Sequence, residues 1–357
     1  MMDQEAATPT TGSETDKQRR GVLKTLAAIG AAVLTPAALM TSTLSRAAEP
    51  KYKYKLAISL PQTHPIAAGL IAACADILRE SNGVLAIEVF YGGQLGSDAD
   101  TVSQVRSGAI DFVSTAGLVW GTLVPVASIN VTAFAFPDYP TVWNAMDGEL
   151  GAHVRAAFDK VNLVPQSKMW DHGFRHITNS AKPINTPQDV SGMKIRIPVS
   201  PMLTSLFKGL GAAPATMPYG ELYTALQTHI VDGQENPLTV VETGKLYEVQ
   251  KFCSLTAHAW DGFWLVANKR SWNALPDDLR QLASRLFDAN ALKERAASAA
   301  LNASLMNSLK ARGISFNKVD AKPFREALQK AGYYSEWQKK FGTDAWALLE
   351  KYSGKLA

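Results

Sequence analysis

Strand-like and helix-like segments alternate between residues 54 and 115, and this alternation constrains the fold more than any other feature. Apolar periodicity predicts strands and helices in the order 54–60, 66–80, 85–91, 98–107 and 111–115. A β-α-β-α-β order predicts a parallel, doubly wound sheet. Because ligands of such sheets bind beyond the carboxyl ends of the strands, we expect a binding site at that edge.

Polar and aromatic side chains follow these strands at the expected edge. The binding candidates are Ser59, His64, Gln94, Thr115 and Trp120. A histidine such as His64 could hydrogen-bond a hydroxyl or keto oxygen, although a loop histidine is more often only exposed. The glycine-rich loop 92–96 lacks the G-x-G-x-x-G spacing, and Asp98 would repel a phosphate at the helix start. We therefore expect no nucleotide cofactor, and no metal site.

The chain is longer than one hydrophobic core usually supports. Its 357 residues predict two lobes, and a net charge of +4 is too small for a nucleic-acid-binding surface. A helix-forming run from Pro276 to Arg312 would exceed about 50 Å, enough to lie across both lobes. We expect an α/β fold with crossovers near 172 and 260, in which lobe I comprises 48–172 plus 261–300 and lobe II comprises 173–260 plus 301–357.

The first 47 residues have the order of an export signal. Arg19-Arg20 precede an apolar run from Leu26 to Leu34, and Ser45-Arg46-Ala47 supplies small residues before a cut at Ala48. The paired arginines resemble a twin-arginine signal. A retained membrane anchor is the alternative, but the run is too short to span a bilayer. We expect a periplasmic protein that is soluble after cleavage.

Cys74 and Cys253 are the two cysteines of the chain. Export would permit a disulfide between them. Cys74 lies in an apolar helical pattern, however, and Cys253 is far away in sequence. We expect two separately buried thiols.

A short segment, Gly192–Pro198, has the period of a strand. Met193, Ile195 and Ile197 alternate with Lys194 and Arg196. The guanidinium of Arg196 can bind a carboxylate through two parallel hydrogen bonds. The alternative is an outer strand that exposes both cations to water.

Five linked motifs extend from this segment. They are Gly192-Met-Lys-Ile-Arg196-Ile-Pro, Gly211-Ala-Ala-Pro-Ala-Thr-Met-Pro218, Glu221-Leu-Tyr-Thr-Ala-Leu-Gln227, Val231-Asp-Gly-Gln-Glu235-Asn236-Pro237 and Tyr247-Glu-Val-Gln-Lys251. In this order and spacing, the chain from 52 to 357 resembles the solute receptors of tripartite ATP-independent periplasmic (TRAP) transporters. The resemblance implies a two-lobe fold of type II-like periplasmic receptors, each lobe a sheet flanked by helices, with a long helix spanning both.

The resemblance also implies a function and a set of binding residues. Such a receptor closes on an organic acid and delivers it to a membrane permease. In the family the position of Arg196 pairs with the ligand carboxylate, Arg175 adds a cation, Asn236 a hydrogen bond and Tyr219 an aromatic contact. Ser59, Gln94 and Thr115 close from the other lobe, and Glu235 joins the candidates. The alternatives are an Arg175–Asp171 salt bridge and an Asn236 side chain that caps the turn before Pro237.

One residue departs from the family pattern. His229 stands where many members have glycine, and we expect this change to alter only the helix end.

Aromatic side chains are numerous near the predicted cleft. They are Trp120, Trp170, Phe174, Tyr219, Trp260 and Trp264. They could stack on a ligand ring, although core packing is the more common role for any single one. We expect a sugar acid or another hydroxy or keto monocarboxylate, with an aromatic acid next. The receptor could be a monomer or a dimer.

Other functions have less support. An exported hydrolase or lyase would need a catalytic motif, but there is no G-x-S-x-G, H-E-x-x-H or Cys/His cluster. Glu221 and Glu235 could be argued as paired acids, but the first opens a helix and the second is predicted in a turn. We expect no enzymatic activity. A periplasmic sensor of organic acids, which serves a membrane signalling partner, remains an alternative.

Overall fold

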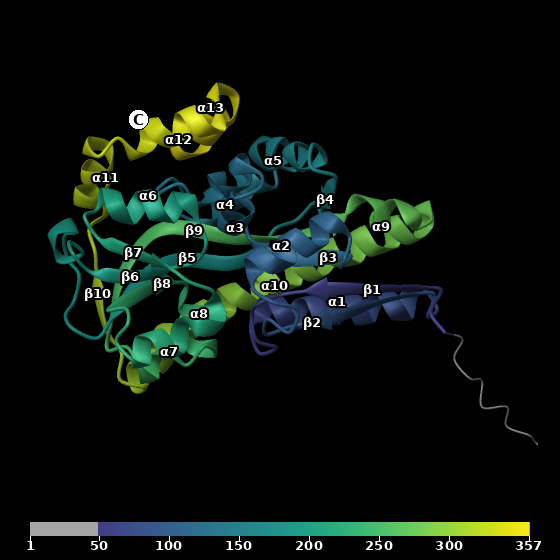
Figure 1. Ribbon diagram of the computed structural model, residues 1–357, viewed down its shortest axis with the longest axis horizontal. Helices are drawn as coiled ribbons and strands as arrows, with labels where there is room; N and C mark the ends of the chain where they lie inside the picture. Colours follow the sequence, from purple (N-terminus) through teal and green to yellow (C-terminus); the bar gives the residue numbers. More distant parts are fainter. Residues whose placement is uncertain (1–48, 357) are drawn as a thin grey trace, which may run out of the picture. The chain divides into compact units, whose positions relative to one another are not determined.

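A mixed sheet runs through residues 49–356, the part of the chain that the computed structural model describes (Figure 1). Its main path follows the order β2 (Leu85–Phe90), β1 (Tyr52–Ala57), β3 (Phe112–Ala116), β9 (Phe252–Asn268), β5 (Trp170–Asn179), β8 (Gly233–Asn236), β6 (Lys194–Ile197) and β7 (Ala213–Thr216). Two further strands, β4 (Leu163–Pro165) and β10 (Ser315–Lys318), pair with β9. The predicted α/β class is confirmed. The predicted export signal lies outside the described residues.

The first half of the sheet, formed by β1, β2 and β3, follows the predicted alternation. β1 pairs in parallel with both β2 and β3, and α1 (Pro65–Glu80) and α2 (Asp98–Ser107) connect them. α2 begins with a capping box between Ser97 and Asp100 and ends at Gly108, whose φ of 82° suits glycine. Local sequence signals therefore fix both ends of this helix.

The second half contains a strand that the sequence analysis placed in a turn. β8 lies between β5 and β6 and is fully buried, although its residues Gln234, Glu235 and Asn236 are polar. The Gln234 amide donates to the Thr178 hydroxyl at 2.8 Å, and Glu235 binds Arg175. These partners lie far away in the chain. They satisfy the buried polar groups that would otherwise exclude such a segment from a sheet.

Two strands pass through both halves of the sheet. β5 and β9 pair antiparallel along most of their lengths, with register shifts at Asp171/Gly173 and at Arg175/Ile177. Gly173 has a φ of 113° and Ala257 a φ of 42°, both in the left-handed region. The shifts interrupt the ladder between the part of β9 that pairs with β3 and the part that pairs with β10.

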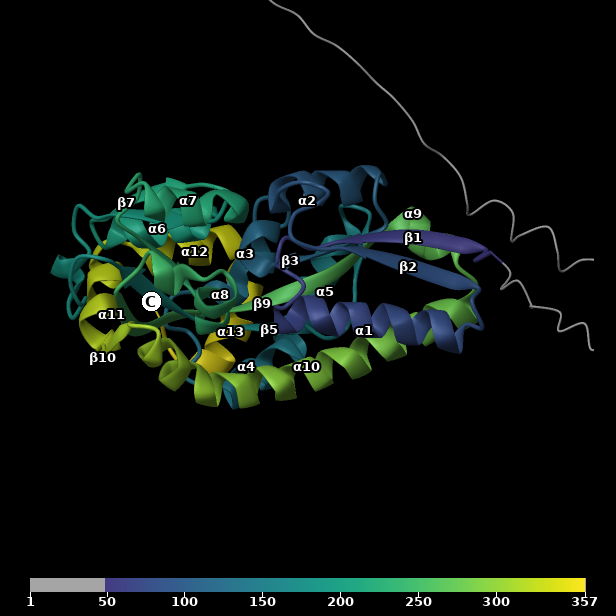
Figure 2. The same cartoon turned by 90° about the horizontal axis from the view of Figure 1, so that it is seen from below.

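The long helix was predicted correctly. α10 (Asp277–Ala311) packs along α1 in the first half and reaches β10 and α8 (Leu238–Thr243) in the second (Figures 1 and 2). Six further helices are α3 (Gly117–Trp120), α6 (Pro201–Gly209), α9 (Lys269–Ala274), α11 (Ala321–Lys330), α12 (Tyr333–Phe341) and α13 (Thr343–Ser353). No helix in residues 49–356 is both long and apolar enough to cross a membrane.

Two predicted helices differ from the structure. The sequence after Pro137–Pro140 predicts one helix from Thr141 to Lys160, but the structure divides this stretch into α4 (Tyr139–Met146) and α5 (Glu149–Asp159). The division brings backbone atoms together, since a Cβ at Gly151 would lie 1.8 Å from the Met146 carbonyl oxygen. The sequence also predicts one helix from Tyr219 to Ile230, but the structure has a 3-10 turn at Tyr219–Glu221 followed by α7 (Leu222–Gln227). Two residues after the end of α7, His229 has a positive φ, a conformation that favours glycine.

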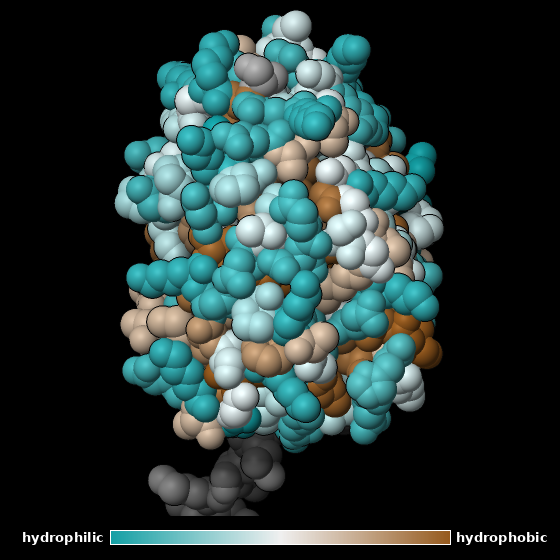
Figure 3. All heavy atoms as spheres, turned by 90° about the vertical axis from the view of Figure 1, so that its left-hand side faces the viewer, coloured by the Kyte–Doolittle hydropathy of each residue, from teal (hydrophilic) through white to brown (hydrophobic). Residues whose placement is uncertain are grey.

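Apolar side chains gather inside this fold. The end of the molecule near β7 and β10 carries mainly hydrophilic residues (Figure 3). Cys74 and Cys253 are both buried and free, as predicted.

Candidate ligand-binding site

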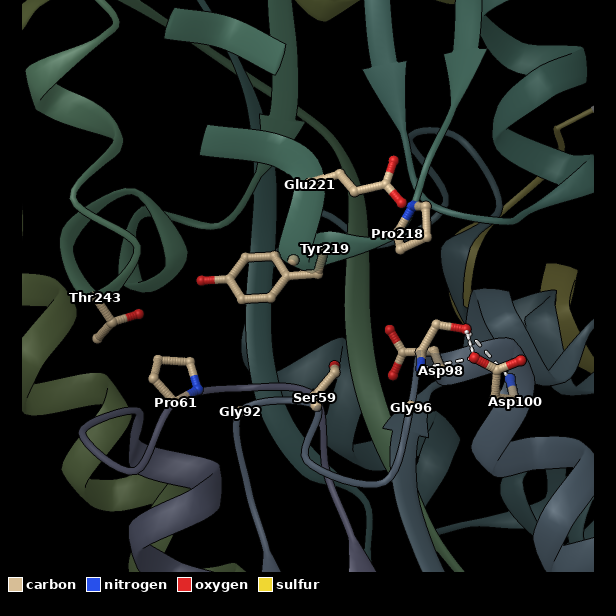
Figure 4. Close-up of a pocket in the computed structure, with 13 residues that line it drawn as sticks. Ser59, Pro61, Gly92, Gly96, Asp98, Asp100, Pro218, Tyr219, Glu221 and Thr243 are labelled. Carbon is tan, nitrogen blue, oxygen red and sulfur yellow. Dashed lines mark hydrogen bonds between the residues drawn. The ribbon is translucent and has the colours of Figure 1, made fainter. Parts of the chain in front are cut away.

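A cleft lies where loops of the two halves meet. Its wide outer part, the outer cleft, has a volume of about 570 Å³, and its narrow inner part, the inner cleft, about 30 Å³. Ser59, Asp98 and Tyr219 line both parts. Figure 4 shows Pro218, Tyr219 and Glu221 of the second half facing Ser59, Pro61 and Asp98 of the first.

Arg196 lines the inner cleft and is 2% exposed, so the solvent-exposed alternative does not hold. Its neighbours Ile195 and Ile197 on β6 are buried in the core, whereas Lys194 is exposed. The Arg196 Nε and Nη2 atoms donate to the Met217 carbonyl oxygen at 3.1 and 2.8 Å. Within residues 49–356 Arg196 forms no ion pair, and burial lowers its pKa to about 10 although Glu235 opposes the shift. Its charge therefore remains available to an anionic ligand.

Arg175, by contrast, is neutralised by the protein. Its Nε and Nη2 donate to the two carboxylate oxygens of Glu235 at 2.5 and 2.7 Å, and its Nη1 donates to Asp261 Oδ2 at 2.7 Å. Arg175 therefore forms salt bridges, as the alternative to ligand binding predicts, but its partners are Glu235 and Asp261 and not Asp171. Burial alone would raise the pKa of Glu235, yet Arg175 and His258 outweigh it and lower that pKa to about 2.

Asn236 joins Arg175 to the inner cleft. Its Oδ1 accepts from Arg175 Nη2 at 3.1 Å, and its Nδ2 donates to Gln234 Oε1 at 2.6 Å. These side-chain contacts differ from the turn cap proposed beside Pro237. The amide is held in one orientation at the wall of the cleft.

The first half contributes a carboxylate, that of Asp98, which is not among the predicted binding residues. Asp98 lines both parts of the cleft, and its Oδ1 accepts from the Thr115 hydroxyl at 2.7 Å. Burial raises its pKa, while hydrogen bonds from Thr115 and Ser59 and the charge of Arg196 oppose the rise. The sequence does indicate a separate role for Asp98, because α2 has two acidic residues in its first turn and its capping box uses only Asp100.

The family of the chain follows from comparison with known proteins. Residues 56–340 match the family described as bacterial extracellular solute-binding protein, family 7. The chain belongs to this family. The 2,3-diketo-L-gulonate-binding periplasmic protein YiaO of Escherichia coli is 33% identical over 255 residues, which cover 71% of this family 7 protein and 77% of YiaO. The uncharacterized protein y4mM of Sinorhizobium fredii is 36% identical over 225 residues, but the chain spans only 41% of its length.

Solved structures resemble this family 7 protein over most of its length. A TRAP periplasmic solute binding protein from Roseobacter denitrificans with bound β-D-glucuronate has a TM-score of 0.80 and 29% identity, covering 85% of this chain and 99% of that one. One from Sulfurospirillum deleyianum with bound succinate has a TM-score of 0.78 and 27% identity, with the same coverage. The predicted membership in the TRAP receptor family is confirmed.

Several predicted binding residues of this family 7 protein do not line either part of the cleft. Trp120 is buried against Phe158, and Trp170 against Gly69 of α1. Gln94 is exposed on its loop. His64 caps α1, and Thr115 and Glu235 lie behind the wall, where they hold Asp98 and Arg175. Ser59, Arg175, Arg196, Tyr219 and Asn236 do meet in the inner cleft.

Proposed function

We propose that this chain captures an organic acid in the cleft, with the ligand carboxylate at Arg196 in the inner cleft, and delivers it to a TRAP-type membrane permease. The observation that carries the proposal is the state of Arg196, a buried cation that lines the inner cleft and has, among residues 49–356, only the Met217 carbonyl oxygen as a hydrogen-bond partner. A carboxylate leaving water loses several kcal/mol of solvation, about the amount that a fixed and desolvated cation can offset. Arg175, paired with Glu235 and Asp261, fixes Asn236 in this proposal and is not itself a free second cation.

The ligand we propose is a monocarboxylate that carries hydroxyl groups. Asp98 supports this class, because its carboxylate can accept hydrogen bonds from a hydroxyl but would repel a second carboxylate. Glucuronate in the Roseobacter structure and diketogulonate in the name of YiaO belong to the same chemical class.

Binding in this proposal closes the two lobes on the ligand. We infer that the lobes meet near residues 172 and 260, with 48–172 plus 261–300 forming one lobe and the remainder the other. The register shifts at Asp171/Gly173 and Arg175/Ile177 support this division, because an interrupted ladder bends more easily than a regular one. The ligand shifts the balance toward the closed state through its contacts with both lobes.

The proposal also says where the protein acts and that it does not alter its ligand chemically. We infer export through the Arg19-Arg20 signal, cleavage before Ala48 and release of the ligand unchanged to the permease. Replacement of both arginines by lysine should retain the precursor in the cytoplasm.

A thermal-shift screen of the chain from Ala48 tests the receptor function. The library contains carboxylic acids and the corresponding neutral sugars and polyols. Ligand at a hundred times its dissociation constant stabilises the folded state by about 2.7 kcal/mol, which is easily detected. We expect shifts only from carboxylates, and none in Arg196→Ala. Shifts from neutral compounds alone, or carboxylate shifts that survive in Arg196→Ala, would overturn the proposal.

A further inference from the structure

Two buried histidine rings lie close together, and one of them, that of His172, lines the inner cleft. His172, on β5, lines the inner cleft, and His64 stands at the start of α1. Their ring centroids are 5.5 Å apart, and the side chains are 4% and 0% exposed. Burial lowers the pKa of both imidazoles well below the usual value, so both are neutral.

The hydrogen bonds of each ring determine which nitrogen carries its proton. His64 Nδ1 accepts from the backbone N–H of Ile66 at 3.2 Å, so the proton of this ring is on Nε2. His172 Nδ1 lies 3.3 Å from Asp261 Oδ2, which already accepts from Arg175 Nη1 at 2.7 Å. Because that oxygen accepts, His172 Nδ1 is the donor and His172 Nε2 carries a lone pair.

Both remaining nitrogens are buried and have no hydrogen-bond partner within the part of the chain that the structure describes. His64 Nε2–H is an unused donor, and His172 Nε2 is an unused acceptor. A buried polar atom with no hydrogen bond costs about 1–3 kcal/mol, so a pair of them beside a binding cleft indicates a missing group. Among residues 49–356 no group of three His, Cys, Asp or Glu side chains is placed to hold a metal ion.

We propose that a hydroxyl group of the ligand binds between His64 Nε2 and His172 Nε2. The hydroxyl oxygen accepts a hydrogen bond from His64 Nε2–H, and the hydroxyl hydrogen is donated to His172 Nε2. One hydroxyl group therefore satisfies both nitrogens. A keto oxygen can only accept and leaves His172 unpaired, and a methylene group leaves both unpaired. The inference rests on the proposed function and narrows it, from hydroxy or keto acids to hydroxy acids.

Matched acids and one substitution test this subsite. The probes are L-lactate, pyruvate and propanoate, then D-erythronate with butanoate, and D-gluconate and D-glucuronate with hexanoate, each titrated calorimetrically. His64→Asn is the informative variant, because an asparagine oxygen can still accept from the Ile66 N–H while the Nε2–H donor is lost. His172→Asn is the second variant, in case the first folds poorly.

The expected result is preferential binding of hydroxy acids, which His64→Asn weakens by roughly 10- to 100-fold while affinities for the matched acids without hydroxyls stay unchanged. Equal effects on both members of a pair, or no effect, would mean that the nitrogens hold a permanent water and would overturn the inference. Binding of keto or alkyl acids only would also overturn it. If no carboxylate binds, the receptor function itself fails.

Discussion

Arg175 and Glu235 form a buried ion pair through two parallel hydrogen bonds, of 2.5 and 2.7 Å, between neighbouring strands β5 and β8. Removing one partner leaves a buried charge uncompensated. Glu235→Gln should therefore lower the free energy of unfolding by about 3–5 kcal/mol, measured by urea denaturation. Glu326→Gln, which removes an exposed pair with Lys322, is the control and should leave stability nearly unchanged. A loss as small as that of the control would mean that the pair is dispensable.

Arg196→Lys should abolish most of the ligand affinity. A lysine ammonium cannot both reach the Met217 carbonyl and present a planar pair of donors to a carboxylate. We expect a loss of about 3–5 kcal/mol in binding free energy by calorimetry. Lys194→Ala on the same strand removes an exposed cation and should bind normally. Wild-type affinity in Arg196→Lys would contradict the role of this side chain.

Asp98→Asn should change selectivity more than stability. The carboxylate of Asp98 repels a second ligand charge, and such juxtaposed like charges cost several kcal/mol in a desolvated site. We expect the affinity for succinate, relative to D-glucuronate, to rise by roughly 10-fold or more. Competition calorimetry with the two acids measures the ratio. An unchanged ratio would show that Asp98 does not discriminate by charge.

Glu294 of α10 should make the protein less stable as the pH rises. Its carboxyl group accepts from the Asp171 N–H at 2.8 Å and from the Ser298 hydroxyl at 2.5 Å, and burial, assisted by Asp171, raises its pKa from 4.5 to about 8. Between these values the folded state holds a proton that the unfolded state has lost. The contribution is complete below pH 4.5 and disappears as the pH rises through about 8, with a slope of up to ~1.4 kcal/mol per pH unit.

Urea midpoints at intervals between pH 5 and 8 measure this slope. Burial also raises the pKa of Asp171 to about 6 and that of Asp261 to about 7, so both carboxyls act in the same direction. Glu294→Gln keeps the shape of the side chain and should flatten the upper part of the profile. Parallel profiles for the two proteins would contradict the assignment.

Gly151→Ala tests the close approach between α4 and α5. The new Cβ would lie 1.8 Å from the Met146 carbonyl oxygen, so the backbone must move. We expect a loss of roughly 2–3 kcal/mol in the free energy of unfolding, by thermal or urea denaturation. Gly220→Ala, where no atom lies within 4 Å of the new carbon, is the matched control. Equal stabilities would show that the break between the helices adapts freely.

Local patterns predicted the elements that depend on local interactions. The α10 helix, the parallel β1–β3 unit and the strand that carries Arg196 follow from periodicity, caps and glycine stops. β8 was missed because its polar residues resemble a turn, and only their partners on β5 and β9 make burial possible.

The site was predicted best where a motif carried it. Arg196, Tyr219 and Asn236 meet in the inner cleft, whereas Trp120 and Trp170 are core residues that single-residue reasoning could not distinguish from stacking aromatics. No local sequence pattern predicts that Asp261 pairs with Arg175. Its role follows from the antiparallel register that brings it beside Gly173, two residues from Arg175.

The reactivity of the two buried thiols reports local unfolding. Cys74 lies in α1 of the first half and Cys253 in β9 where that strand pairs with β10 in the second. Burial raises the pKa of both, so neither reacts with alkylating reagents while its surroundings stay folded. The rate at which each sulfur is modified therefore reports how often its own half of the protein opens, and a bound ligand that joins the halves should slow both reactions together.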